Sequence, residues 1–288
     1  MAKPDHGHYY VPEGTYWPIL GSIGLITLVV GFIYILNGGS GTVLMLAGTA
    51  VMIVMLFGWF GEVIRENESS TYHAWEDKSF RLGMVWFIFS EVMFFAAFFG
   101  ALFYARVLSV PWLGGSGEEA DTHTLLWNSF QAMWPSNGPA DVGGKFEPMN
   151  TWGLPALNTV ILLSSAGTVT WAHHALKRGN RRNLITGLAI TVFLGFLFVG
   201  LQAMEYYHAY HELNLTLGSG IYGSTFFMLT GFHGLHVTLG AIMLTVILFR
   251  CIKGHFTPDN HFAFEAAAWY WHFVDVVWLG LFVFVYWL

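Results

Sequence analysis

The chain has 288 residues, of which 55% are hydrophobic and 10% are charged, and its formal net charge is -6. A soluble domain carries about 25% charged residues, so this composition excludes an ordinary soluble protein and predicts one that resides in lipid. The basic residues flank apolar segments rather than forming a patch, which excludes a nucleic-acid surface.

Seven apolar segments follow one another along the chain, each long enough to cross a bilayer as a helix. They cover Trp17–Leu36, Val43–Gly61, Phe80–Val107, Trp152–Leu176, Leu184–His208, Gly220–Phe249 and Ala266–Leu288. The sequence therefore predicts an all-α integral membrane protein with seven transmembrane helices, in which residues 1–288 form a single membrane domain. The N-terminus has no apolar core followed by a small-residue cleavage site, so we expect no removable signal peptide.

The lysine and arginine residues predict the orientation of the chain. When seven segments alternate across a membrane, ten of the twelve basic residues fall on one side, and Arg106 and Lys145 fall on the other. By the positive-inside rule the N-terminus is cytoplasmic, and an odd number of crossings places Leu288 and the 108–151 loop outside. The lone Cys251 cannot form an internal disulfide.

A charged group of three residues stands at the inner edge of the second segment. Glu62, Arg65 and Glu66 lie close together in the sequence. A guanidinium offers planar paired donors to a phosphate, so Arg65 is a candidate for binding a lipid headgroup. Anchoring of this helix end at the inner interface is a compatible interpretation.

The third segment contains one acidic residue, Glu91. A helix rises ~1.5 Å per residue, so Glu91 lies about 15 Å from Arg81, near the middle of a hydrocarbon core ~30 Å thick. An ionised aspartate at that depth costs roughly 2.5–3.5 kcal/mol. We therefore expect Glu91 to be protonated, turned toward a polar partner, or engaged in proton or lipid chemistry.

The loop of residues 108–151 is rich in turn-forming sequence and predicts no second core. Within it, the stretch TLLWNSFQAMW, residues 124–134, allows two interpretations. One is a short helix at the membrane surface with its tryptophans at headgroup depth, and the other is an ordered but passive loop.

The fourth and fifth segments carry polar residues near their ends. The adjacent His173 and His174 project about 100° apart on a helix, so a headgroup-facing edge is favoured over one shared metal ion. Glu205 and His208 have the Glu-x-x-His spacing of di-iron bundles, but the sequence has no second copy. We expect a solvated or headgroup-facing polar end there.

The sixth and seventh segments each carry a polar pair with a spacing of three residues, which places both members on one helix face. His236 lies about 21 Å from Arg250 along its helix, a depth that overlaps that of Glu91. A Glu91–His236 hydrogen bond is favoured over a metal ion held by His233 and His236. In the last segment, His272 and Asp275 predict an internal polar pair, with a proton-relay role as the alternative.

Several signatures of redox or hydrolytic sites are absent from the sequence. It has no cysteine pair of the kind that holds a dinuclear copper centre and no CxxCH motif for haem attachment. It also lacks a phosphate-binding glycine loop, a nucleophile elbow and HExxH. We therefore expect neither catalytic residues nor a cofactor or metal on this chain.

Seven blocks of residues make the chain similar to a known family. They are EVIRE (62–66), FSEVMFF (89–95), TWAHH (170–174), LQAMEYY (201–207), YGSTFF (222–227), TGFHGLHV (230–237) and AWYWHFVDVVW (268–278). In these blocks and over nearly its full length the chain resembles subunit III of the haem–copper cytochrome c oxidases.

The resemblance implies two helices, at about residues 17–61, set apart from five helices at about residues 80–288 by a V-shaped cleft filled with phospholipid. It implies a non-catalytic subunit that packs on subunit I, which holds haem and copper, while subunit II receives electrons from cytochrome c. The implied work is support of proton uptake, protection against inactivation during turnover, and lipid and oxygen access.

The resemblance also implies roles for single residues. Glu91 matches the family's carbodiimide-reactive carboxylate, and His236 matches its partner histidine. The positions that match lipid-headgroup contacts are Arg65, Glu66, Arg250, Lys253 and His255.

The chain departs from the mitochondrial members of the family in two places. Trp59-Phe60-Gly61-Glu62 stands where those members have Trp-Trp-Arg-Asp, which removes one arginine. The 108–151 loop is longer than the mitochondrial form, which suggests a bacterial protein of the inner membrane.

Two rival functions remain open from the sequence. One is a similar component of a quinol oxidase or nitric oxide reductase assembly, whose relatives usually resemble five-span proteins. The other is an autonomous proton or solute transporter that uses Glu91, His236 and Asp275. Transporters of that kind often show internal repeats, and this sequence shows none.

Overall fold

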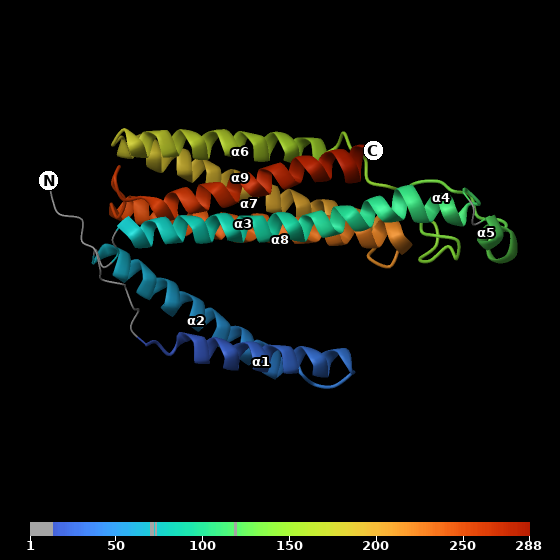
Figure 1. The fold of residues 1–288 in the computed structure, drawn as a ribbon, viewed down its shortest axis with the longest axis horizontal. Helices are drawn as coiled ribbons and strands as arrows, with labels where there is room; N and C mark the ends of the chain where they lie inside the picture. The colour runs from blue at the N-terminus through green and yellow to red at the C-terminus, as the bar shows by residue number, and fades with distance from the viewer. Residues whose placement is uncertain (1–13, 70–71, 73, 118–119) are drawn as a thin grey trace. The chain divides into compact units, whose positions relative to one another are not determined.

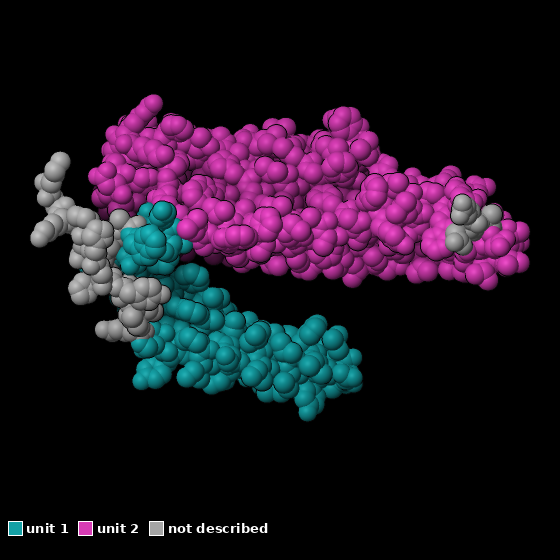
Figure 2. Space-filling model, viewed as in Figure 1, with its two compact units in different colours: residues 1–80 teal, residues 81–288 magenta. Residues whose placement is uncertain are grey.

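The computed structural model describes residues 14–69, 72, 74–117 and 120–288, and Figure 1 shows its ribbon. The chain divides into two compact units, Met1–Phe80 and Arg81–Leu288, which Figure 2 draws in different colours. Seven helices in the described part of the chain are long and apolar enough to cross a membrane. The prediction of an all-α membrane protein with seven spans is therefore confirmed.

The first unit contains the helical hairpin of α1 (Trp17–Leu36) and α2 (Thr42–Glu68). Two glycines let the helices approach closely, because a Cβ on Gly31 would stand 2.3 Å from the backbone nitrogen of Met45. A Cβ on Gly48 would likewise stand 2.3 Å from the backbone nitrogen of Leu28. Lipid tails are as apolar as the helices, so close packing at such small residues is what holds a membrane hairpin together.

The second unit contains the other five spans. Its longer elements are most of α3 (Ala74–Phe103), followed by α6 (Leu154–Lys177), α7 (Arg181–His211), α8 (Gly220–Lys253) and α9 (Phe262–Leu281). Its short elements are the π-helix η1 (Tyr104–Ser109), α4 (Val110–Leu113), α5 (Ala120–Leu126) and the π-helix η2 (Phe282–Trp287). Among the longer helices, each of α6, α7 and α8 packs against the next, and α9 packs against both α8 and α6.

The core of the second unit lies inside this group of four helices. Trp271 and Trp278 of α9 are fully buried there, and their ring nitrogens donate to the hydroxyls of Ser165 and Thr159 of α6, both at 2.9 Å. Helix α3 reaches the group mainly through large side chains, with the rings of Phe95 and Phe273 6.1 Å apart. The packing of α3 therefore depends on aromatic contacts and on the few polar pairs that link it to α8 and α9.

Most of the helices extend beyond the apolar segments. Helix α2 continues to Glu68 instead of ending at Gly61, because glutamate and arginine are good helix formers that extend a helix past the apolar stretch. Helix α7 begins at Arg181, and the side chain of its N-cap residue Asn180 accepts a hydrogen bond from the backbone nitrogen of Asn183 at 3.1 Å. Helix α8 ends at Lys253 and is capped by Gly254, which has a left-handed φ of 83°.

The interfacial helix considered for residues 124–134 is absent from the structure. Helix α5 ends at Leu126, and the chain then turns, with the backbone nitrogen of Phe130 donating to the carbonyl of Trp127 at 3.0 Å. Asn128 and Ser129 favour such turns over helix because their side chains compete for backbone hydrogen bonds. The ordered-loop interpretation is therefore the one that fits.

Candidate functional site

Glu91 and His236 form a polar pair between α3 and α8. The carboxylate oxygen Oε2 of Glu91 lies 2.8 Å from Nε2 of His236, and the two side chains are 23% and 10% exposed. The contact that their matching depths predicted is therefore present.

The other ring nitrogen of His236 fixes where the protons of this pair lie. Nδ1 lies 2.6 Å from the carbonyl oxygen of Phe232, and because a carbonyl only accepts, Nδ1 carries a hydrogen. In a neutral ring Nε2 then carries a lone pair and no hydrogen. A proton must therefore lie between Nε2 and the carboxylate of Glu91. The pair holds this one proton either as carboxylic acid and imidazole or as carboxylate and imidazolium, and both forms have no net charge.

Aromatic rings surround the imidazole of His236. Phe95 lies edge-on at 5.0 Å between ring centroids, Tyr270 stacks at 6.3 Å, and Phe94 and Phe273 lie at 6.0 and 6.5 Å. A pair without net charge suits such surroundings, because an uncompensated charge there would be costly. The pair thus joins α3 to the bundle without placing a charge in the membrane.

Glu91→Gln is expected to leave the fold, the assembly and the initial turnover of a complex that contains this chain nearly unchanged. The amide can donate to Nε2 of His236 as the carboxylic acid does. Glu91→Leu should instead destabilise the chain by about 1–3 kcal/mol, because it leaves Nε2 without a partner. Thermal unfolding and steady-state turnover measure both effects, with Ser90→Ala on the exposed face as control. An immediate loss of turnover in Glu91→Gln would contradict this view of the pair.

His233, three residues before His236, does not share a site with it. Its Nε2 donates to the carbonyl oxygen of Val274 at 3.2 Å, and its ring lies 5.1 Å from that of Trp278. The two histidines therefore contact different neighbours, and the structure does not bring them together as ligands of one metal ion. This agrees with the hydrogen-bonded interpretation of His236.

The expectation of a solvated end at Glu205 is wrong. Glu205 is fully buried, and its Oε1 accepts a hydrogen bond from the hydroxyl of Tyr286 at 2.6 Å. Tyr286 lies in η2, far along the chain, so the spacing within α7 gave no sign of this partner. His208 is separate from this contact and lies 3.0 Å from the carboxylate of Glu212.

His272 and Asp275 lie together near the surface that α9 shares with α6. Nδ1 of His272 is 3.5 Å from Oδ2 of Asp275, and Nε2 of the same ring is 3.3 Å from the hydroxyl of Thr170. The side chain of Asp275 is 6% exposed and that of His272 is 43% exposed. The aspartate of this pair is therefore buried inside the protein, and its histidine is exposed at the surface.

The candidate lipid-binding residues have different surroundings. Arg65 and Lys253 are exposed, whereas Glu66 and His255 are half-buried. Arg250 is buried, with its guanidinium 4.5 Å from the ring centroid of Phe256. Lys253 is thus the basic residue at the end of α8 that is open to an anionic group, and Arg250 is held within the protein.

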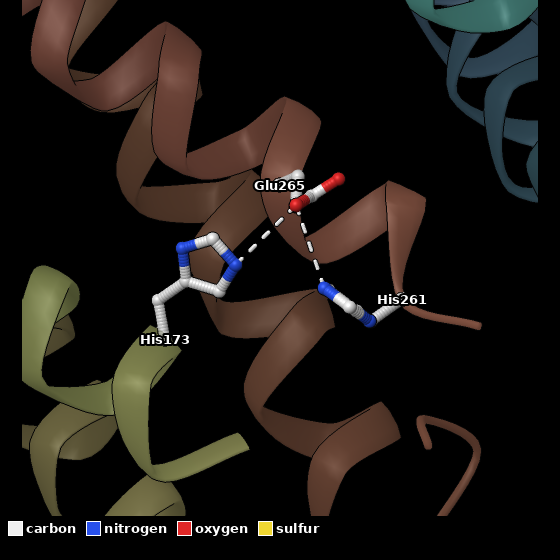
Figure 3. Close-up of side chains that lie close together, drawn as sticks. All are labelled: His173, His261 and Glu265. Atoms are coloured by element: carbon white, nitrogen blue, oxygen red, sulfur yellow. Dashed lines mark ion pairs between the residues drawn. The ribbon is translucent and has the colours of Figure 1, made fainter. Parts of the chain in front are cut away.

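A cluster that the sequence did not predict lies at the same end of the bundle as Arg250 and Lys253. His173 of α6, Glu265 of α9 and His261, which immediately precedes α9, converge as Figure 3 shows. Nε2 of His173 and Nε2 of His261 lie 3.5 and 3.4 Å from the same oxygen, Oε1 of Glu265. The spacing of four between His261 and Glu265 was the available signal, and His173 therefore faces protein rather than only headgroups.

Comparison with known proteins identifies the family. Residues 6–288 match the family model described as cytochrome c oxidase subunit III. The proteins named "Cytochrome c oxidase subunit 3" from Coturnix japonica and Carassius auratus are each 42% identical to this chain, and that from Cyprinus carpio is 41% identical. Each alignment spans 288 residues, 100% of this chain and 99% of the relative. The chain therefore belongs to the cytochrome c oxidase subunit III family, a non-catalytic component of that oxidase.

Proposed function

We propose that this chain supports the catalytic subunit of a terminal cytochrome c oxidase by sustaining proton uptake, limiting inactivation during turnover and holding phospholipid. The observation that carries the proposal is the Glu91–His236 pair, whose polar groups bond to each other and to a carbonyl. Such a pair ties helices together without adding charge to the membrane. The V-shaped lipid cleft and an oxygen route stay predictions.

The partners in this proposal are subunits I and II of the oxidase. Haem and copper belong to those subunits, and cytochrome c reaches this chain only indirectly, through subunit II. The chain is a multi-pass membrane protein, and we place it in a bacterial inner membrane with a cytoplasmic N-terminus and a periplasmic C-terminus. The distribution of basic residues supports that orientation.

We propose phospholipid as the ligand of the basic residues at the ends of α2 and α8. Exposed Arg65 and Lys253 offer cationic donors at the ends of α2 and α8, with Glu66 and His255 beside them in sequence. Cationic side chains near the membrane surface attract the phosphates of anionic lipids. Arg250 is buried with its guanidinium over the ring of Phe256, so we assign it a role in holding the end of α8 in place.

Removal of this chain from the purified oxidase should leave the initial turnover rate close to normal but reduce, several-fold, the number of turnovers before inactivation. Proton uptake should also slow at high pH. Oxygen consumption followed to exhaustion of activity measures the first effect, and re-addition of the chain is the control. An oxidase whose lifetime and proton uptake do not depend on the chain would overturn the proposal.

The seven spans favour this function over its closest rival. The quinol oxidase and nitric oxide reductase relatives usually resemble five-span proteins that lack the first two helices, and this chain has α1 and α2. A transporter would instead act alone. Proton or solute flux through vesicles that contain only this chain would support that rival and count against the support role.

A further inference from the structure

We propose that His173, His261 and Glu265 form a binding site for a divalent transition-metal ion of the Zn²⁺ class, which would tie α6 to the start of α9. The ligand atoms of these three residues lie within 4.8 Å of one another. Figure 3 shows both imidazoles directed at one carboxylate. Such a site is independent of the proposed support function and is not a redox centre.

The tautomer of His261 leaves a lone pair directed into the cluster. Nδ1 of His261 lies 3.1 Å from the carbonyl oxygen of Thr257 and therefore carries the hydrogen. Nε2 of the neutral ring then faces Oε1 of Glu265 at 3.4 Å with no proton between them. Two acceptors that face each other in this way need a cation, either a second proton on the imidazole or a metal ion.

Neither inward ring nitrogen is satisfied by hydrogen bonds. His261 is 9% exposed, and Nε2 of His261 and Nε2 of His173 are both buried without a hydrogen-bond partner among the residues that the structure describes. Buried polar atoms normally find partners, so two such nitrogens beside one carboxylate oxygen require an explanation. A shared metal ion satisfies both nitrogens at once.

The spacing of the three atoms fits tetrahedral zinc coordination. Zinc binds histidine nitrogen at about 2.0–2.1 Å and carboxylate oxygen at about 2.0–2.2 Å, so two ligand atoms of a tetrahedral site lie roughly 3.4 Å apart. The two nitrogen-to-oxygen distances are 3.5 and 3.4 Å. The two imidazole nitrogens lie within 4.8 Å of each other, so metal binding would draw them together, and a fourth position would remain for water.

The ligand set also selects the class of metal. Two imidazoles and one carboxylate suit zinc and related first-row ions, whereas Mg²⁺ and Ca²⁺ prefer oxygen ligands. Arg81 bonds to Oε2 of Glu265 and leaves Oε1 directed at the histidines. Outer partners of this kind orient the ligand, so Arg81 acts as a positioning residue.

The test is a Zn²⁺ titration of the full-length chain in detergent after removal of metal with a chelator. We expect one site that His173→Asn weakens by tenfold or more, since loss of an outer partner alone costs about 10–100-fold. The matched control is His174→Asn, because this exposed neighbour bonds to the carbonyl of Thr170 and not to the cluster. Equal affinity in both variants would overturn the site.

A second measurement covers the case in which His173→Asn fails to fold. X-ray absorption at the zinc edge of the wild-type chain, loaded with one equivalent, should show two imidazoles in the first shell. A spectrum with one imidazole or none would overturn the proposal. Millimolar Mg²⁺ should not displace the zinc, and displacement would contradict a nitrogen-rich site.

Discussion

Gly48→Ala is expected to separate α1 from α2, although it adds a single methyl group. The new Cβ would stand 2.3 Å from the backbone nitrogen of Leu28, 2.7 Å from its Cα and 2.8 Å from the carbonyl oxygen of Gly24. Backbone atoms cannot rotate away as a side chain can, so the helices must move apart. Overpacking typically costs about 1–3 kcal/mol, and the loss of the close interface adds to that.

Gly61→Ala is the matched control on the same helix, because an added Cβ there meets no atom within 4 Å. Alanine is the better helix former, so Gly61→Ala should be neutral or slightly stabilising. Only Gly48→Ala should therefore lower the stability of the hairpin. The midpoint of thermal unfolding, followed by circular dichroism in detergent, measures both, and equal midpoints would contradict the packing described for α1 and α2.

Trp271→Ala should destabilise the second unit by about 3–5 kcal/mol, the range for loss of a buried aromatic side chain. Trp271 is fully buried, and its ring fills the space beside Gly195 and Gly240, where an added Cβ would lie 2.7 and 2.8 Å from it. Its ring nitrogen also donates to Ser165. The expected result is poor recovery of folded chain and a lowered unfolding midpoint.

Two controls separate the causes of this loss. Trp86→Ala removes the same side chain at a position that is 68% exposed, and it should have little effect on the isolated chain. Ser165→Ala removes only the hydrogen bond from Trp271 and should cost about 1 kcal/mol. If Trp271→Ala behaved like Trp86→Ala, the core described for α6 to α9 would be wrong.

The fold was largely predictable because membrane helices are marked by long apolar segments. The seven spans, the length of α1 and the start of α8 follow from the apolar segments and the polar residues that bound them. Helix ends were less predictable, since a polar stretch such as that after Gly61 leaves the lipid while it continues the helix. The loop of residues 124–134 offered no periodicity that separates helix from turn.

The part of the candidate site that could be predicted is the contact constrained by the depth of two residues in the membrane. Glu91 and His236 were expected to meet because both lie near mid-membrane and each needs a polar partner. Glu205 was misplaced because its partner, Tyr286, lies on another helix and no spacing within α7 reveals it. The cluster of His173 and Glu265 was missed for the same reason, since it needs the packing of α6 against α9.

The most direct test of the central claim is mild-detergent affinity purification of this chain from its membrane, followed by a reduced-minus-oxidised spectrum. Iron and copper are measured before and after the partners are removed. A supporting subunit should bring haem and copper with it and lose both when subunits I and II leave. Haem or copper that stays with the isolated chain would contradict the account and return His233 and Glu205 to consideration as ligands.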